Sequence, residues 1–298
     1  EFVDEPSDDF FDDMLLLYVY AKHLHKEIDI TEFEKFINFQ IDSGINALVV
    51  CGTTGEASTM SKEEKIATIK CAVKTSAGRV PIIAGTGSNN TSSAIEMATI
   101  AEILGVDALL IVTPYYNKTT QKGLISHFRN IANSVSLPII LYNVPSRTSM
   151  NILPETVLEL SKIDNIVGIK EASGNISQVA KIASLCGDDF AIYSGNDDQI
   201  CPILSLGGKG VISVLSNVAP KLACSITNSF FKKATDEACF YQLQAMPLIE
   251  ALFAETNPIP IKSAINMLGF DFGVPRLPLV ECSANLKNKI RQIYDTTK

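Results

Sequence analysis

The sequence predicts a (β/α)8 barrel, or TIM barrel, followed by a helical C-terminal region. Along most of the chain, apolar runs with strand character alternate with helical patterns, and no Gly/Ser-rich linker interrupts them. Such alternation is typical of a parallel sheet with right-handed crossovers. Eight strand-helix units fit within about 220 residues, which suits a closed barrel. A doubly wound open sheet is the alternative, and eight units alone do not exclude it.

The strands are expected where apolar and often β-branched residues run together. Continuous runs of this kind indicate strands that are buried on both faces, as in a parallel sheet. The expected strands cover residues 15–20, 45–50, 80–84, 107–112, 138–142, 166–170, 190–193 and 210–214.

Capping residues mark where the helices between these strands begin. Thr31 with Glu34, and Ser61 with Glu64, each form the pattern of a capping box. Pro154 suits the first position of a helix. Further helices are expected over residues 92–104, 123–133, 176–185 and 198–206, and after Asn217.

Composition divides the chain into three parts. Residues 1–13 hold seven acidic and no basic residues, which predicts an acidic tail that is disordered or derived from cloning. The barrel is expected over residues 14–233. Residues 234–298 contain no further strand run and predict a C-terminal helical region packed on the barrel, with helices over 237–253 and 259–268.

Charge and hydropathy argue against nucleic acid and membrane as partners. Outside the tail, 26 acidic residues face 25 basic ones, so no basic surface for nucleic acid is expected. No apolar run approaches the roughly 18 residues that span a bilayer. The run at residues 14–20 is short and follows acidic residues, which argues against a signal peptide.

Cysteine, histidine and glycine usage bears on location and cofactors. Seven scattered cysteines without a Cys-x-x-Cys pair indicate a reducing, cytoplasmic location. With only three histidines, a histidine-built metal site is not expected. Asn90 stands where the third glycine of a dinucleotide-binding motif beginning at Gly85 would be, so no dinucleotide site is expected.

Polar residues follow several expected strands at the point where each strand ends. Barrel enzymes keep their chemistry at the C-terminal ends of the strands. A collection of polar groups on this one rim therefore indicates a single site. The groups are GTTGE at 52–56, TPYY at 113–116, Tyr142 with Asn143, Arg147, Lys170, and SGN at 194–196.

Lys170 is the candidate nucleophile of this site. It ends the apolar run that begins at Ile166, and low-dielectric surroundings disfavour the charged form of an amine. The neutral amine is the species that attacks a carbonyl to form a Schiff base. The alternative is a lysine that extends from the strand end into solvent. The polar groups on the same rim argue against that alternative.

Each of the other groups also has a structural alternative. Residues 52–56 are either a tight strand-to-helix turn or a cradle of N–H groups and hydroxyls for a carboxylate. Tyr115 and Tyr116 belong either to ordinary packing or to the site. Arg147 is either a solvated loop residue or a planar clamp for a carboxylate.

Four segments in this order resemble the dihydrodipicolinate synthase family. The family belongs to the pyruvate-dependent class I aldolase superfamily, which also includes N-acetylneuraminate lyase. The resemblance covers roughly residues 28–280 and implies a barrel with a helical C-terminal region, assembled as a homotetramer of two tight dimers. The segments are GTTGE at 52–56, TPYYNK at 113–118, YNVPSRT at 142–148 and GIKEASG at 168–174.

The resemblance implies an activity and the residues that carry it. The reaction condenses pyruvate with L-aspartate 4-semialdehyde to 4-hydroxy-tetrahydrodipicolinate, in lysine biosynthesis through diaminopimelate. Lys170 would hold pyruvate as a Schiff base, which needs neither a metal nor an organic cofactor. Tyr142 and Thr53 would relay protons, together with Tyr116 donated across the tight dimer interface.

The resemblance also assigns the substrate-binding residues. Thr54 would hold the carboxylate of pyruvate, and Arg147 would receive the carboxylate of the semialdehyde. The backbone of Gly195 and Ile212 would line the pyruvate pocket.

Three other activities remain open at this point. N-acetylneuraminate lyase shares the fold and the lysine, but it usually has Ser-Thr in the turn at Thr53 and lacks the arginine at Arg147. A keto-deoxy-sugar-acid aldolase is a third choice, and an inactive ligand-binding barrel is a fourth. One departure from the family concerns Tyr20-Ala21-Lys22-His23, where family members have a strand ending in Thr-Pro-Phe. The exit loop of the first strand is therefore expected to differ.

Feedback control by lysine is expected to be poor. Lysine-inhibited members bind lysine in a cleft at the tight dimer interface, using helix histidines, an asparagine and a glutamate. The matching residues here are Lys62, Lys65, Asn89 and Ser93. A cationic ligand would meet two cations and lose its carboxylate partner. If the two lysines instead pair with neighbouring Glu63 or Glu64, lysine would still bind weakly.

Overall fold

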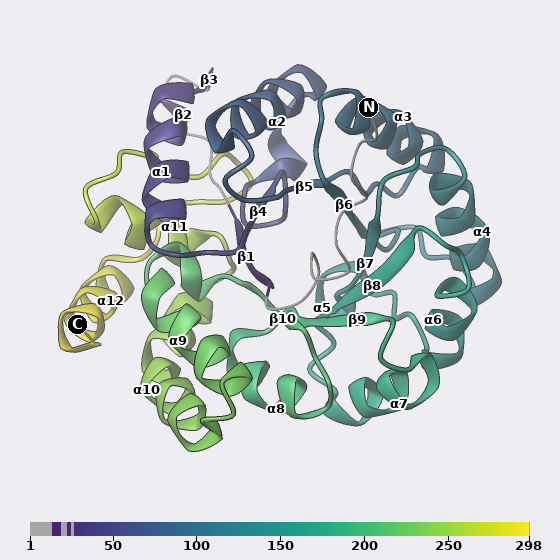
Figure 1. Cartoon of the computed structure of the whole chain (residues 1–298). Coiled ribbons are helices and arrows are strands. Elements are labelled where there is room, and N and C mark those ends of the chain that lie inside the picture. The colour runs from purple at the N-terminus through teal and green to yellow at the C-terminus, as the bar shows by residue number, and fades with distance from the viewer. Residues whose placement is uncertain (1–13, 19–22, 25–26, 298) are drawn as a thin grey trace.

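The computed structural model describes residues 14–18, 23–24 and 27–297, and Figure 1 shows their arrangement. No helix in this part of the chain is long and apolar enough to cross a membrane. The acidic segment 1–13 and the departure at residues 20–22 lie outside the described residues. His23 falls in a two-residue strand, β2 (His23–Leu24), which pairs antiparallel with β3 (Glu27–Ile28).

Eight parallel strands close into a barrel. Each neighbouring pair is parallel, and β1 closes the ring because it pairs with both β10 and β4. This closure confirms the predicted (β/α)8 barrel and excludes the open sheet. The strands are β1 (Met14–Tyr18), β4 (Ala47–Val50), β5 (Ile82–Gly85), β6 (Ala108–Val112), β7 (Ile139–Asn143), β8 (Ile166–Glu171), β9 (Ala191–Ser194) and β10 (Gly210–Ser213).

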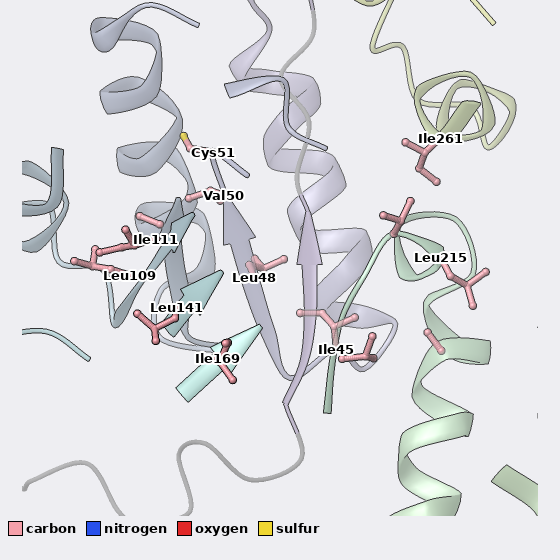
Figure 2. Packing of buried hydrophobic residues seen from close by; sticks show 14 of the residues in the cluster. Ile45, Leu48, Val50, Cys51, Leu109, Ile111, Leu141, Ile169, Leu215 and Ile261 are labelled. Atoms are coloured by element: carbon pink, nitrogen blue, oxygen red, sulfur yellow. The ribbon is translucent and has the colours of Figure 1, made fainter. Parts of the chain in front are cut away.

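Successive residues along each strand point alternately into the barrel and out toward the helices. On β6, for example, Leu110 belongs to the inner apolar cluster, whereas Leu109 and Ile111 belong to the larger outer one. Figure 2 shows part of the outer cluster, where strand residues meet Leu215 and Ile261 from the later part of the chain. Both faces are apolar, which explains the continuous hydrophobic runs in the sequence.

A ring of helices surrounds the strands (Figure 1). The helices that follow β3, β4, β5, β6 and β8 begin where an Asp, Ser, Asn or Thr side chain accepts a hydrogen bond from a backbone N–H of the first turn. The helices are α1 (Ile30–Asp42), α2 (Lys62–Ser76), α3 (Thr91–Ile103), α4 (Gln121–Ala132), α5 (Pro145–Thr148), α6 (Pro154–Leu160), α7 (Ile176–Cys186), α8 (Ile200–Ser205) and α9 (Pro220–Phe231). Three 3-10 turns are η2 (Ala57–Thr59), η3 (Asp197–Gln199) and η4 (Leu215–Asn217).

The predicted caps are confirmed at two positions and wrong at one. Ser61 and Glu64 form the capping box at the start of α2, and Pro154 is the first residue of α6. Thr31, however, is not the cap of α1. The Asp29 side chain accepts from the N–H of Glu32, which places the cap two residues earlier. An aspartate is a stronger N-cap than a threonine, and this preference decides the start.

The C-terminal region is helical and packs beside α9. It contains α10 (Thr235–Phe253), α11 (Ile259–Met267) and α12 (Ala284–Thr297). In Figure 1 these helices lie against the side of the barrel that carries β1 and β10. The segment between α10 and α11, and the loop after α11, both reach the turn that follows β4. These contacts bring the C-terminal region to the rim of the barrel where the strands end.

Candidate active site

Lys170 lies in the barrel between two tyrosines. It is on β8, where its register partners are Tyr142 on β7 and Tyr193 on β9. Its side chain is only 1% exposed, and Nζ lies 4.3 Å from the centroid of the Tyr142 ring. The alternative of a lysine that extends into solvent from a strand end, which the polar rim argued against, is therefore excluded. The apolar strands enclose the amine.

Burial sets the protonation state of the Lys170 amine. The low-dielectric surroundings disfavour the charged ammonium and hold the pKa of Lys170 well below its usual value. Asp197, at the end of β9, opposes this effect because its carboxylate favours a nearby cation. Burial in turn raises the pKa of Asp197. Desolvation is the dominant cause for Lys170, so burial favours the neutral form of the amine, which is the form that attacks carbonyls.

Tyr142 and Thr53 lie together beside this amine. Burial raises the pKa of the Tyr142 phenol, while the charge of Arg147 and the Thr53 hydroxyl both oppose the rise. Tyr142 therefore keeps its proton at neutral pH and has a second hydroxyl next to it. Such a pair can pass a proton between the Lys170 region and the pocket above.

The turn after β4 holds Thr53 and Thr54. Thr54 is buried, and its hydroxyl oxygen accepts a hydrogen bond of 2.8 Å from Asn257 Nδ2. Cys51 at the start of the turn and Glu56 at its end have φ of 57° and 55°, in the left-handed region that non-glycine residues rarely adopt. The turn is therefore maintained by contacts with the rest of the molecule.

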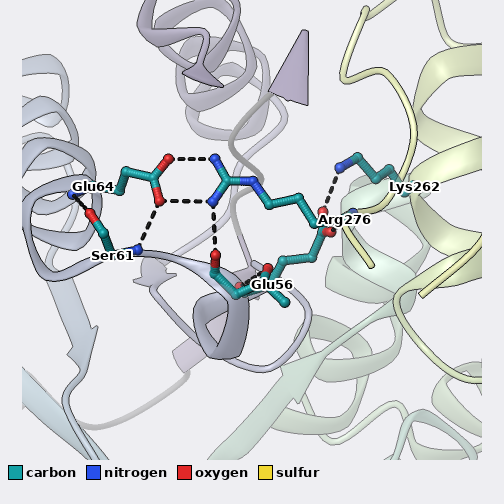
Figure 3. Close-up of polar contacts among 6 residues, drawn as sticks. Glu56, Ser61, Glu64, Lys262 and Arg276 are labelled. Atoms are coloured by element: carbon teal, nitrogen blue, oxygen red, sulfur yellow. Dashed lines mark hydrogen bonds and ion pairs between the residues drawn. The ribbon is translucent and has the colours of Figure 1, made fainter. Parts of the chain in front are cut away.

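A buried ion pair supplies part of that support (Figure 3). Glu56 accepts from Lys262 Nζ of α11 and, at 2.9 Å, from the backbone N–H of Arg276. The Arg276 guanidinium then binds both carboxylate oxygens of Glu64 and donates to the Thr59 carbonyl. The C-terminal region thus contacts the turn at Glu56, the last residue of the turn.

A pocket of about 640 Å³ opens above these groups. Thr53, Tyr142 and Arg147 line it, together with Lys65 on α2. Its charged lining residues are the cations Lys65 and Arg147, and no carboxylate of the described chain joins them. Arg147 is exposed and donates from Nη2 to the Asn257 carbonyl at 3.2 Å. The pocket is therefore suited to anionic ligands.

The family model for the dihydrodipicolinate synthetase family matches residues 15–297. The chain belongs to that family. A 4-hydroxy-tetrahydrodipicolinate synthase from Thermoanaerobacter sp. (strain X514) is 58% identical over 255 residues, covering 84% of this chain and 86% of the relative. The 4-hydroxy-tetrahydrodipicolinate synthase 1 of Clostridium acetobutylicum is 56% identical over 261 residues, 88% of each chain.

Solved structures give the same result. A crystal structure of a dihydrodipicolinate synthase is 43% identical with a TM-score of 0.93, and it covers 95% of this chain and 98% of its own. The synthase of Thermotoga maritima gives a TM-score of 0.94 at 38% identity, covering 96% and 99%. The similarity therefore extends through the barrel and the C-terminal helices of this family member.

Gly195 and Ile212, two predicted substrate-binding residues, lie in the tightly packed interior of the barrel. A Cβ atom on Gly195 would lie 3.1 Å from Lys170 Cε and 2.6 Å from the Ala172 side chain, so only glycine fits against the lysine. Ile212 is fully buried in the inner apolar cluster together with Tyr142 and Tyr193. Like Lys170 and Thr54, these two residues are not among those that line the 640 Å³ pocket, whereas Tyr142 and Thr53 are.

Tyr116, another predicted site residue, is exposed, unlike the buried Lys170 and Tyr142. It lies at the edge of the pocket, 93% exposed, and makes no hydrogen bond with Thr53 or Tyr142. Its φ of 69° is unfavourable for a tyrosine. A large apolar ring fixed outward in a strained conformation suits a contact with another molecule.

Sequence reasoning missed Asp197 and Asn257. Asp197 follows Gly195 by two residues at the end of β9, and the acidic pair Asp197-Asp198 at a strand end was a usable signal. It acts on Lys170 electrostatically and accepts backbone hydrogen bonds from Val214 and Leu215. Asn257 lies between two C-terminal helices, and no local pattern connects it with the barrel rim.

Proposed function

We propose that this family member condenses pyruvate with L-aspartate 4-semialdehyde to give 4-hydroxy-tetrahydrodipicolinate, in lysine biosynthesis through diaminopimelate. The observation that carries the proposal is the enclosed Lys170 amine, whose pKa is lowered by burial and whose Nζ lies 4.3 Å from the Tyr142 ring centroid. Relatives named 4-hydroxy-tetrahydrodipicolinate synthase at 56% and 58% identity support the same activity.

Lys170 begins the reaction as the nucleophile. Its neutral amine adds to the ketone carbon of pyruvate, and loss of water gives an imine. The protonated imine withdraws electrons, so a methyl proton leaves and an enamine forms. Tyr142 and Thr53 pass the protons of these steps. Gly195 leaves space for the adduct, since any side chain there would meet Lys170 Cε.

The second substrate completes the ring. The enamine carbon attacks the aldehyde carbon of the semialdehyde, which forms the new C–C bond and leaves a hydroxyl. The amino group of the semialdehyde then attacks the imine carbon and displaces the Lys170 amine, which closes the ring and regenerates the free lysine. Thr54, which is buried, holds the pyruvate carboxylate, and Arg147, which lines the pocket, holds that of the semialdehyde.

The same proposal includes the assembly and location of the protein. Tyr116 would enter the active site of a partner subunit across a tight dimer interface, and two dimers would form a homotetramer. Its exposed ring and its φ of 69° support this. The seven free cysteines support a cytoplasmic location. We further propose that residues 14–233 form the catalytic barrel and that 234–298 are its helical extension, while the acidic segment 1–13 lies outside the described residues.

Borohydride trapping tests the proposed chemistry. Incubation with pyruvate and borohydride should add a stable pyruvate-derived mass to the Lys170 peptide, and neither Lys170→Ala nor Lys170→Arg should trap. Lys262 is the internal control, because it is fully buried but paired with Glu56. An adduct on Lys262 would contradict the assignment, and no adduct at all would indicate an inactive barrel. Pyruvate release from N-acetylneuraminate would indicate the lyase instead.

Mixing two inactive variants tests the exchange of Tyr116. Lys170→Ala and Tyr116→Ala should each lack activity when purified alone. If Tyr116 acts in the partner subunit, a hybrid dimer contains one intact site, and activity should return after subunits exchange. Sedimentation of each variant checks that the assembly is unchanged. A mixture that stays inactive although hybrids form would place Tyr116 in its own subunit or outside the reaction.

A further inference from the structure

Asn257 is the residue that contacts both proposed carboxylate-binding side chains. Its side-chain Nδ2 donates to the Thr54 hydroxyl oxygen at 2.8 Å, and its main-chain carbonyl accepts from Arg147 Nη2 at 3.2 Å. It is only 5% exposed and lies just before α11, far along the chain from either partner. One buried asparagine thus connects the turn after β4 with the loop after β7.

The direction of the hydrogen bond to Thr54 determines what Thr54 can do. A hydroxyl has one proton to donate and two lone pairs that accept. Because Asn257 Nδ2 donates to the Thr54 oxygen, the hydroxyl proton is directed elsewhere. Among the described residues the structure gives it no acceptor. Thr54 is thereby set as a donor, which is the role that an incoming carboxylate requires.

We propose that Asn257 is a positioning residue that sets the Thr54 hydroxyl as a donor to the pyruvate carboxylate. The proposal rests on the proposed function. The contact of Asn257 with Arg147 uses the main chain, so substitution of the side chain leaves it in place. The two substrates should therefore respond differently to a change at Asn257. A merely structural role would affect both alike.

Asn257→Asp is the decisive variant because it keeps the shape and reverses the hydrogen bond. A carboxylate only accepts, so the Thr54 proton would turn toward it and be lost to pyruvate. Losing a hydrogen bond to a charged group corresponds to about tenfold or more in affinity. We expect KM for pyruvate, and half-saturating pyruvate in borohydride trapping, to rise by about that factor. KM for the semialdehyde should change by less than about twofold.

Further variants separate this effect from charge and from folding. Asn257→Ala adds no charge and should still raise KM for pyruvate, by roughly 2- to 12-fold. In a Thr54→Val background, Asn257→Asp should weaken pyruvate binding far less than in the native chain. Asn266→Asp is the matched control, since Asn266 braces the nearby loop through Phe272 N and Gly273 O. It should lower Tm and leave both KM values unchanged.

The results distinguish this inference from the proposed function. If the native chain gives no pyruvate adduct, both are overturned. If the native chain traps pyruvate and Asn257→Asp has the same half-saturation, the inference alone is overturned. Equal rises in KM for both substrates, or a full effect in the Thr54→Val background, would also overturn it, because either outcome shows that Asn257 does not act through Thr54.

Discussion

At the scale of single residues, Lys170 shows how a barrel interior creates a nucleophile. Burial lowers its pKa well below the ordinary lysine value, and Asp197 limits the change. In the proposed reaction, the Asp197 carboxylate would likewise favour the cation that forms when the amine becomes an iminium.

The lowered pKa of Lys170 makes stability depend on pH. The unfolded chain holds the Lys170 proton up to the ordinary lysine pKa of about 10.4, whereas the folded chain releases it at lower pH. Between the two pKa values the unfolded state binds more protons, so the free energy of unfolding rises with pH. Lys170→Met removes this penalty. We expect its Tm to exceed that of the native chain at neutral pH, and the gap to narrow toward pH 10 in calorimetry. A less stable Met variant would contradict this.

Arg147→Ala should impair the use of the semialdehyde and leave the use of pyruvate largely unchanged, the opposite of the effect expected for the Asn257 variants. Arg147 is exposed at the pocket, whereas Lys170 is enclosed, so the arginine should contact only the second substrate. Losing a charge-assisted hydrogen bond costs roughly 1.5–3 kcal/mol, or about 10- to 150-fold in kcat/KM for the semialdehyde. Initial-rate kinetics with each substrate varied in turn measures this. Equal losses in kcat/KM for both substrates would show that Arg147 maintains the structure of the site and does not bind the semialdehyde specifically.

The sequence was sufficient for residues whose position is set locally. Tyr142 and Lys170 end adjacent strands, so the barrel topology alone brings them together. Asn257 could not be found in this way, because its contacts join it to Thr54 and Arg147 across 203 and 110 residues. The ion-pair partner of Lys62 was also not predicted. It pairs with Glu96 on α3 rather than with the neighbouring Glu63 or Glu64.

At the scale of elements, the turn after β4 is held between α2 and α11. Glu64 caps α2 through Ser61 and also binds Arg276, so one carboxylate joins the helix start to the C-terminal loop. Lys262 approaches Glu56 from the other side. The turn that carries Thr53 and Thr54 is thus fixed by elements that contribute no group to the reaction.

The buried Lys262–Glu56 pair should make large but non-additive contributions to stability. Lys262 is fully inaccessible, so Lys262→Met leaves an unpaired buried carboxylate and should cost about 3–5 kcal/mol in the free energy of unfolding. The double variant Lys262→Met, Glu56→Gln should lose much less than the sum of the single changes. Urea denaturation of the four proteins measures the cycle. Strict additivity would show that the two groups do not interact.

The positions of the strands and helices could be predicted from the hydrophobic pattern of the sequence. Where a helix begins depended also on which of two nearby side chains caps it. The strands at 107–112 and 166–170 were expected almost as found, because their apolar runs end where the polar rim begins. The predicted cap of α1 was wrong by two residues, because Asp29 rather than Thr31 accepts the hydrogen bond from the N–H of Glu32. Such a choice between two nearby capping residues depends on local geometry that the pattern alone does not contain.

At the scale of the whole molecule, the charge of the pocket predicts poor inhibition by lysine. Lys65 and Ser93 line the pocket, Asn89 donates to the Tyr115 carbonyl at 3.3 Å, and no acidic residue of the described ranges lines the pocket. Glu96 neutralises Lys62, which leaves Lys65 as the cation that a lysine ammonium would meet. We expect activity at saturating pyruvate to be almost unchanged by millimolar lysine. A sub-millimolar midpoint in an inhibition curve would contradict this. Lysine is present in the related structure from Cyanidioschyzon merolae, which makes that protein a positive control.

Lys170 is buried, whereas Arg147 is exposed at the pocket, and this difference in depth predicts the order in which the two substrates bind. Apolar side chains such as Ile83, Leu110 and Ile140 fill the barrel interior, so we expect the amine to be reached from the rim. In the proposed reaction, pyruvate would therefore form its imine with Lys170, with loss of water, before the semialdehyde binds. A semialdehyde molecule that docks first at Arg147 would block the way in. At high concentration the second substrate should thus compete with the first, and additional pyruvate should relieve the block.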